Sequence, residues 1–365
     1  MVAPQFNRNK MNTSRDEKTQ SGISVSPHWT SWLKEHKISL MFTSSRKDKI
    51  FIVGPDKEEK LAIFENDCAV PMGLCCINPQ RIYVGIIHQI WQLENIIKAE
   101  DSNIDFDCLY LPVATHTTGS IAIHDMGIDK DENVLFINAL FSCLCTPSDG
   151  YSFRPIWKPK FISKVVPQDR CHLNGLAMKD GKAKYITAFC NSDVEQGWRK
   201  DCNNKGLLID IESNEIICQE LCMPHSPRWY RDKLWVCNSG TGEFGFIDLE
   251  KGCFEAIAFF PGYLRGLCFV GDFAIIGSSD ARESPAFRKT SLFERLEEAK
   301  TPCFRGLQVI DLRDGSTPHF LDGKKVFKEL NDVIPLQDIC IPGGFLSSRR
   351  ALERSILIDD ANNLS

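Results

Sequence analysis

The stretch RWYRDKLWVCNSGTGEFGFIDLEKGCFEAIAFF, residues 228–260, decides the fold of this protein. It holds four β-rich runs separated by the short turns RD, NSGTGE and EKG. Short, evenly spaced strands joined by glycine-containing turns are typical of the four-stranded blades of a β-propeller. The stretch therefore predicts one antiparallel blade.

Segments that resemble the start of this blade recur along the chain, as repeat architectures require. Stacked without gaps, they begin at six positions: VPMGLCCI at Val70, HDMGIDKD at His124, HLNGLAMK at His172, HSPRWYRD at His225, YLRGLCFV at Tyr263 and PLQDICIP at Pro335. Each segment is followed by a further β-rich run, so the six segments predict six inner strands. The expected fold class is all-β, a single six-bladed β-propeller.

The last inner segment lies too near the C-terminal end to be followed by a whole blade. We expect the runs ISLMFTSS, KIFIVG and LAIFE near the N-terminus to complete it, which would close the ring and remove open sheet edges. The predicted division is a mobile tail and short helix over residues 1–36, the propeller over 37–346 and a C-terminal tail over 347–365.

Two helical elements interrupt the β pattern. The first is expected after Ser26, which is placed to cap it, with Trp29, Trp32 and Leu33 on the face that docks on the propeller. The second lies in an insertion over residues 284–303, where Ser291 is placed as the cap. That insertion is predicted to be either surface decoration or a lid over the channel.

Composition limits the classes of function. Of the 365 residues 43% are apolar and 25% charged, and the formal net charge is −5, so nucleic-acid binding is not expected. The longest apolar run is too short to cross a bilayer, and no signal-like segment begins the chain. The 16 cysteines include no CxxC pair, which favours free thiols and a cytoplasmic protein.

The first column of the stacked segments contains His124, His172 and His225. Inner strands of a propeller surround its central channel, so we expect the three imidazoles to converge there. Three nitrogens can hold a divalent ion, Zn²⁺ or a similar metal, with positions open for water or substrate. The alternative is that each histidine is a structural donor.

Other polar residues lie around the same predicted ring. We expect the proton-transferring groups to be among Asp125, Tyr263 and Asp338, and the substrate-binding groups to be Asn174, Arg228, Arg265 and Gln337. Structural salt bridges from the two arginines to Asp125 or Asp338, and a packed role for Tyr263, remain open.

Four stretches resemble an uncharacterised bacterial family known mainly as a conserved hypothetical protein, some members of which are joined to tetratricopeptide repeats. They are HLNGLAM at 172–178, MPHSPRWYRDKLWVCNSGTGEFGFIDLEKG at 223–252, FPGYLRGLCFVGDFAIIGSSDARES at 260–284 and RGLQVIDLRDG at 305–315. The resemblance covers most of residues 40–346. More distantly, NGLA at 174–177 is similar to gluconolactonase and regucalcin-like propellers, in which the asparagine that matches Asn174 binds a divalent metal. The other ligands of those propellers do not map onto this sequence.

These patterns lead to two hypotheses of function. The first is a metal-dependent lyase or hydrolase that acts on a small polar or acidic substrate at the mouth of the central channel. The second is a non-catalytic propeller that binds a peptide, a glycan or a protein partner.

Overall fold

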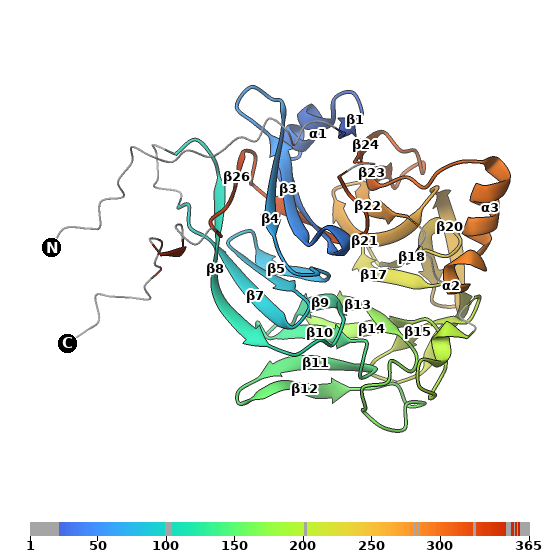
Figure 1. The fold of residues 1–365 in the computed structure, drawn as a ribbon. Helices are drawn as coiled ribbons and strands as arrows, with labels where there is room; N and C mark the ends of the chain where they lie inside the picture. The colour runs from blue at the N-terminus through green and yellow to red at the C-terminus, as the bar shows by residue number, and fades with distance from the viewer. Residues whose placement is uncertain are drawn as a thin grey trace.

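The computed structural model describes residues 22–98, 104–200, 203–280, 282, 285–323, 326–347, 352, 353, 355 and 357. The predicted N-terminal tail and most of the predicted C-terminal tail lie outside these residues. The described strands form six sheets arranged around a central axis, as Figure 1 shows. The predicted six-bladed β-propeller is therefore confirmed.

Each sheet is antiparallel and follows the chain outward from the axis, except where the termini add strands. Blades 1 to 3 are β5 (Leu74–Asn78), β6 (Arg81–Gly85), β7 (Gln89–Asn95) and β8 (Cys108–Thr117); β9 (Ile123–Ile128), β10 (Val134–Asn138), β11 (Cys143–Ser148) and β12 (Tyr151–Trp157); and β13 (Leu173–Lys179), β14 (Lys182–Ala188), β15 (Gly206–Asp210) and β16 (Ile216–Leu221). Blades 4 and 5 are β17 (Pro224–Tyr230), β18 (Lys233–Asn238), β19 (Glu243–Asp248) and β20 (Cys253–Phe259); and β21 (Tyr263–Val270), β22 (Phe273–Ser279), β23 (Gly306–Asp311) and β24 (His319–Asp322).

Blade 6 closes the ring with strands from both ends of the chain. Its inner strand β25 (Leu330–Gln337) pairs with β2 (Ile38–Ser44), which is followed by β3 (Lys49–Pro55) and β4 (Leu61–Asp67). Two short strands attach the flanking segments: β1 (Ser24–Val25) pairs with β24, and β26 (Pro342–Phe345) pairs in parallel with β8. The predicted N-terminal closure is thus confirmed.

The apolar core lies between neighbouring blades. Between blades 4 and 5, for example, Trp235, Phe244, Leu264 and Ile276 are all buried in one cluster. Neighbouring inner strands approach so closely that a Cβ on Gly175 would lie 2.3 Å from Pro227 Cδ of the next blade. This close approach explains why glycine recurs at the fourth position of the predicted segments.

The helix α1 (Trp29–Glu35) buries Trp29, Trp32 and Leu33, as predicted. Its N-cap is His28 rather than Ser26, and no side chain caps it. Ser26 is held elsewhere because β1 pairs with β24, where the Ser26 hydroxyl accepts a hydrogen bond from Phe320 N at 3.1 Å. The predicted cap is therefore wrong, although the docking face is right.

The predicted sixth segment is displaced along the chain. Inner strand β25 begins at Leu330, five residues before Pro335, so Gln337 and Asp338 lie at the far end of the strand and are exposed. There the Asp338 backbone N–H bonds to Lys37 O. The apolar run that follows Pro335 resembles a strand because Leu336 and Ile339 are buried. Gln337 and Asp338 are therefore not at the channel mouth.

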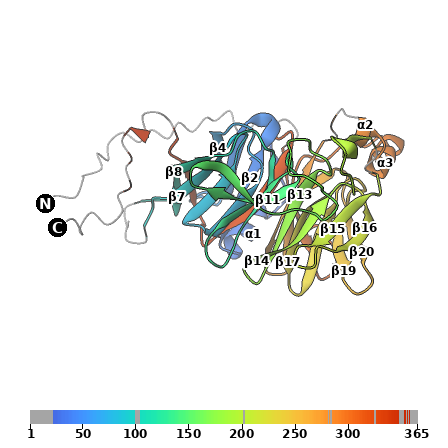
Figure 2. The ribbon, with the colours of Figure 1, turned by 90° about the horizontal axis from the view of Figure 1, so that it is seen from below.

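The two faces of the disc differ. All six inner strands begin at one face, which we call the mouth face. The inserted helices α2 (Pro285–Arg288) and α3 (Ser291–Ala299) lie on this side, whereas α1 lies on the opposite one (Figure 2). Thr290, not Ser291, caps α3 by accepting a hydrogen bond from Phe293 N. Within the described ranges no helix is both long and apolar enough to span a bilayer.

No disulfide joins any two of the 15 cysteines in the described part of the chain. Cys75, Cys190, Cys237 and Cys268 are buried, and Cys340 is half-buried. Burial raises the pKa of Cys237 to about 12, so the thiolate form is suppressed at neutral pH. These residues act as small apolar side chains of the core.

Candidate functional site

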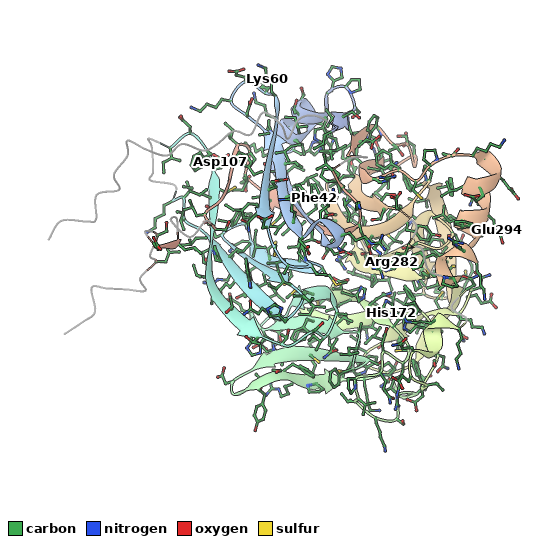
Figure 3. All side chains as sticks on the ribbon, viewed as in Figure 1. Phe42, Lys60, Asp107, His172, Arg282 and Glu294 are labelled. Atoms are coloured by element: carbon green, nitrogen blue, oxygen red, sulfur yellow. The ribbon has the colours of Figure 1, made fainter. Side chains whose placement is uncertain are left out.

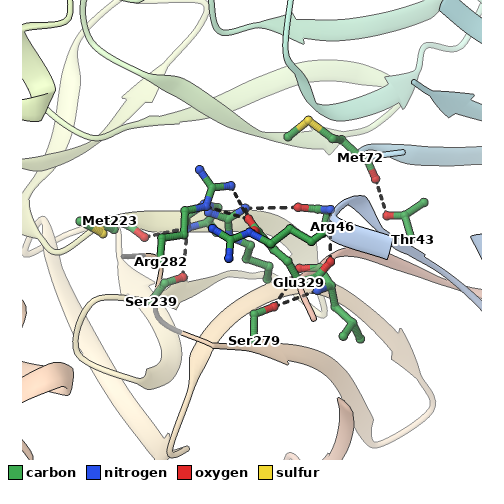
Figure 4. Close-up of polar contacts among 12 residues, drawn as sticks. Thr43, Arg46, Met72, Met223, Ser239, Ser279, Arg282 and Glu329 are labelled. Carbon is green, nitrogen blue, oxygen red and sulfur yellow. Dashed lines mark hydrogen bonds and ion pairs between the residues drawn. The ribbon is translucent and has the colours of Figure 1, made fainter. Parts of the chain in front are cut away.

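Three arginines surround one glutamate at the mouth face. We call Arg46, Arg265, Arg282 and Glu329 the arginine clamp (Figure 4). Arg265 lies near the start of β21 and Glu329 immediately precedes β25, whereas Arg46 and Arg282 follow the ends of β2 and β22. Because these second strands run antiparallel to the inner ones, their ends and the inner-strand starts meet at the same face.

Both carboxylate oxygens of Glu329 are used within the clamp. Its Oε1 accepts hydrogen bonds from Arg265 Nη1 and Arg282 Nε, each at 2.9 Å, and its Oε2 lies 3.0 Å from Arg46 Nε. Arg265 Nη1 also donates to Asn331 Oδ1 at 3.2 Å. The other guanidinium nitrogens have no acceptor in the described part of the chain. They are Arg265 Nε and Nη2, Arg282 Nη1, and Arg46 Nη1 and Nη2.

The clamp carries more positive than negative charge. Burial raises the cost of charging Glu329, yet the arginines hold the pKa of that carboxyl below its usual range. Burial, with Arg282 and Arg46 nearby, lowers the pKa of Arg265 to about 10, which leaves it protonated at neutral pH. Three positive charges against one negative charge leave two uncompensated, and Arg265 is only 3% exposed.

The three predicted histidines lie beside the clamp on the same face. The ring centroids of His124 and His172 are 4.8 Å apart, and Phe189 packs against His172 at 4.5 Å and against His225 at 5.4 Å. They do not share one strand register, however. His124 and His225 are the second residues of their strands, whereas His172 precedes β13 with a positive φ of 50°.

Two of the imidazoles have a defined tautomer. His172 Nδ1 donates to Asp169, 3.0 Å from Oδ1, and Trp198 Nε1 donates to Asp169 Oδ2 at 2.7 Å. Because a carboxylate only accepts, the His172 proton lies on Nδ1 and the lone pair on Nε2. Burial alone would raise the pKa of Asp169, but His172 and these hydrogen bonds bring it below its usual value.

His225 is oriented in a similar way. Its Nδ1 donates to Met223 O at 2.8 Å, which leaves a buried Nε2 with no partner among the described residues. Burial and the positive charge of Arg265 keep the pKa of His225 well below its usual value. Burial and the neighbouring His172 likewise hold the pKa of His124 well below its usual value. His124 and His225 are therefore neutral at pH 7.

The predicted metal site can be tested against this arrangement. Among the described residues, no group of three or more His, Cys, Asp or Glu side chains is placed to hold a metal ion. Arg265 and Arg282 also oppose further positive charge at His124 and His225, since both arginines lower the pKa of each imidazole. The described residues therefore show no metal-ligand group at the three histidines, and the two arginines favour negative over positive charge beside them.

Arg228 does not lie free in the channel as a substrate-binding residue would. Its Nη1 donates to Asp125 Oδ2 at 2.8 Å, and its Nη2 lies 3.1 Å from Asp125 Oδ1 and 3.2 Å from Asp332 Oδ1. The carbonyl oxygens of Leu267, Leu176 and Pro227 take its remaining donors. We call Asp125, Arg228 and Asp332 the channel network. The hydrogen bonds that Asp125 accepts from Arg228 in this network are structural contacts.

Two further predicted site residues have structural partners. Tyr263 is buried, and its hydroxyl contacts Phe287 O at 3.0 Å and Thr290 Oγ1 at 2.7 Å, so it holds the insertion and does not face the channel. Asn174 Oδ1 accepts a hydrogen bond from Thr187 Oγ1 at 2.7 Å, and its Nδ2 has no partner among the described residues. Of the predicted substrate-binding residues, Arg265 alone lies in the clamp.

The sequence interpretation missed Asp169, Arg46, Arg282 and Glu329. Glu329 was hidden by the displaced sixth segment, since it stands directly before the true strand, as His172 stands before β13. Arg46 and Arg282 follow second strands of their blades, so comparing the ends of these strands could have found them. Figure 3 labels His172 and Arg282 on the ribbon.

Fold and mouth face together define a β-propeller with an arginine-rich cluster at the start of its inner strands. Residues 27–344 match the model of a domain of unknown function, DUF4915, so the chain belongs to that family. No curated protein matches the chain in sequence.

Several solved propellers are similar in structure. A chain of the nidogen/laminin complex is 12% identical, covers 83% of this chain and 100% of its own, and has a TM-score of 0.55. A gluconolactonase from Xanthomonas campestris is 13% identical over 78% of this chain and 85% of its own, with a TM-score of 0.45. A virginiamycin B lyase from Staphylococcus aureus is 15% identical over 66% of this chain and 73% of its own, with a TM-score of 0.39. At these identities the likeness concerns the fold alone.

Proposed function

We propose that this protein is an enzyme of the lyase or hydrolase type that acts on a small acidic substrate at the mouth of the channel. The arginine clamp binds the acidic group, and His172 moves the proton. The observation that carries the proposal is the Asp169–His172 hydrogen bond beside a cluster with two uncompensated positive charges.

His172 has the features of a general base. Asp169 fixes the proton on Nδ1, so the Nε2 lone pair is available to accept a proton from substrate or water. Packing against Trp198 at 4.2 Å and Phe189 at 4.5 Å restricts the ring. Asp169 also stabilises the imidazolium once the proton has been transferred.

His225 supports the same reaction through binding. Its buried Nε2 can accept a hydrogen bond from a substrate hydroxyl or amide, which would satisfy an otherwise unpaired polar atom. Such an acceptor lies across Phe189 from His172. We therefore expect the substrate to carry a donor group as well as an acidic one.

The test is a turnover screen with acidic lactones, esters and β-elimination substrates, followed by NMR. For any substrate that reacts, His172→Asn and Asp169→Asn should lower kcat by about 100-fold or more, the usual contribution of a positioned base. His116→Asn is a matched control, because His116 lies in the outer strand β8 of blade 1. An active His172→Asn variant would refute the assignment. Binding of acidic ligands without any turnover would favour the non-catalytic alternative.

The divalent metal expected from the sequence remains a prediction, and it is tested separately. Metal analysis of protein purified without a histidine tag measures it directly. About one equivalent of bound metal, lost in a folded His124→Ala, His172→Ala, His225→Ala variant, would show that His172 acts as a ligand rather than as a free base.

A further inference from the structure

We infer that the arginine clamp binds a phosphate monoester, so that the acidic group of the ligand is a dianion. This inference rests on the proposed function only for the location of the ligand, because the binding site consists of residues other than the Asp169–His172 pair. Charge, free donors and the number of converging guanidinium groups support it.

The charge balance favours a dianion. Glu329 is shared by all three arginines and is ionised, so two positive charges have no partner within the clamp. The carboxylates of Asp125 and Asp332 already bind Arg228, and that of Asp280 binds Arg305. A phosphate monoester carries a charge of about −1.5 to −2 at pH 7, whereas one carboxylate carries a single charge.

The free donors are numerous and come from three directions. Each guanidinium uses part of its N–H groups on Glu329 or Asn331 and keeps others free among the described residues. Glu329 therefore binds all three arginines and holds them side by side. Both of its carboxylate oxygens are used, so it offers no acceptor to the remaining N–H groups. The unused donors need acceptors, and the clamp itself offers none.

Three guanidinium groups match the three terminal oxygens of a phosphate monoester. These oxygens are equivalent, strong acceptors around one phosphorus atom, and arginine pairs with them bidentately. A dicarboxylate would instead need two separate anion sites, whereas the three arginines converge on the single Glu329 carboxylate. The geometry thus favours one compact dianion.

The guanidinium groups differ in accessibility in a way that suits an entering ligand. Arg265 is almost fully buried, with a side chain 4% exposed, while the side chains of Arg282 and Arg46 are 30% and 47% exposed. The buried arginine forms the floor of the site, and the two others stand nearer to solvent. A phosphate that enters from the mouth face meets the exposed pair first.

The experiment is isothermal titration calorimetry of the full chain with methyl phosphate at pH 7.5 and low ionic strength. Dimethyl phosphate and acetate serve as probes with a single charge. We expect methyl phosphate to bind at least about tenfold more tightly than either, and Arg46→Met and Arg282→Met each to weaken it about tenfold or more, since hydrogen bonds to charged groups are strong. Arg231→Met is the control, because Arg231 pairs with Asp272 at the opposite face.

Three binding results would exclude a phosphate monoester as the ligand of the clamp. Equal binding of methyl and dimethyl phosphate, or unchanged affinity in folded Arg46→Met and Arg282→Met variants, would overturn the inference. Tighter binding of malonate than of methyl phosphate would assign a dicarboxylate instead and also overturn it. His172→Asn should keep its affinity for methyl phosphate within about threefold, because it removes no clamp donor. If phosphate fails to bind but a carboxylate substrate turns over through His172, the proposed function stands and this inference falls.

Discussion

The arginine clamp and the channel network use the same side chain in opposite ways. In the network, one guanidinium faces two carboxylates and three backbone carbonyls, and every donor nitrogen of Arg228 has an acceptor. In the clamp, three guanidinium groups share one carboxylate, and several donors have no acceptor among the residues that the structure describes. Burial raises the pKa of Asp332 to about 7, so the network also limits its own negative charge.

This difference shows how to tell a structural arginine from a binding one. The structural Arg228 is half-buried, the clamp arginines range from buried to exposed, and both kinds form salt bridges, so burial and ion pairing do not separate them. The number of unused donors and the local sum of charges do. Arg228 joins four other blades through Asp125, Leu176, Leu267 and Asp332, whereas the clamp lacks the acceptors that a ligand would supply.

The largest effect is expected for Arg228→Met. Removing the guanidinium leaves Asp125 and Asp332 buried without their partner, which should lower the free energy of unfolding by about 3–5 kcal/mol. Urea denaturation measures this loss. Arg231→Met, which breaks an exposed pair, should change stability by less than about 1 kcal/mol. Equal losses in the two variants would contradict a structural role for the network.

Glu329→Gln separates the clamp from the channel network by removing a carboxylate instead of a guanidinium. It removes the shared partner of three arginines and should cost about 2 kcal/mol, because bonds to charged groups are lost. Added methyl phosphate should restore part of that stability, since it replaces the missing negative charge.

The control for this rescue is Asp125→Asn. Its partner Arg228 faces inward and has no donor left for a solvent anion, so methyl phosphate should not restore its stability beyond the small general effect seen in the wild-type protein. Rescue of both variants, measured in the same urea titrations, would mean that phosphate acts on the folded protein non-specifically.

The sequence predicted the architecture well because propeller blades repeat a local pattern. The alternation of strands and turns from Arg228 to Phe260 contains the end of β17 and the whole of β18 to β20, and the runs at 38–67 form β2 to β4. Register was less predictable. Bulges near the starts of the inner strands, as between His225 and Arg228, shift equivalent positions by a residue or more, which an alignment without gaps cannot follow.

The site was predicted only in part for the same reason. The histidines were placed at the right face because each stands near the start of an inner strand. Glu329 was lost when the sixth strand was set five residues too late, and Tyr263 was assigned to the channel although its hydroxyl points to the insertion. Whether Arg228 binds protein or ligand depends on acceptors from four other blades, and no local pattern contains that information.

The smallest effect concerns the insertion, whose role as a lid or as decoration the sequence left open. Arg282 lies between β22 and α2, and it lies 5.8 Å from the Phe287 ring, so the docking of α2 helps to position one clamp arginine. Tyr263 secures that docking through Phe287 O and Thr290 Oγ1.

Tyr263→Phe removes only the hydroxyl, and Phe287 O keeps its hydrogen bond from Thr290. We expect a loss of about 1 kcal/mol in stability and a two- to fivefold weaker affinity for methyl phosphate, each the size of one neutral hydrogen bond or less. Tyr230→Phe is the matched control, because Tyr230 donates a single bond to Gly271 O at the opposite face. If both variants bind methyl phosphate like the wild type, the insertion decorates the surface and does not support the clamp. A loss of affinity confined to Tyr263→Phe would make the insertion part of the binding site, because the Tyr263 hydroxyl holds the segment that packs against Arg282.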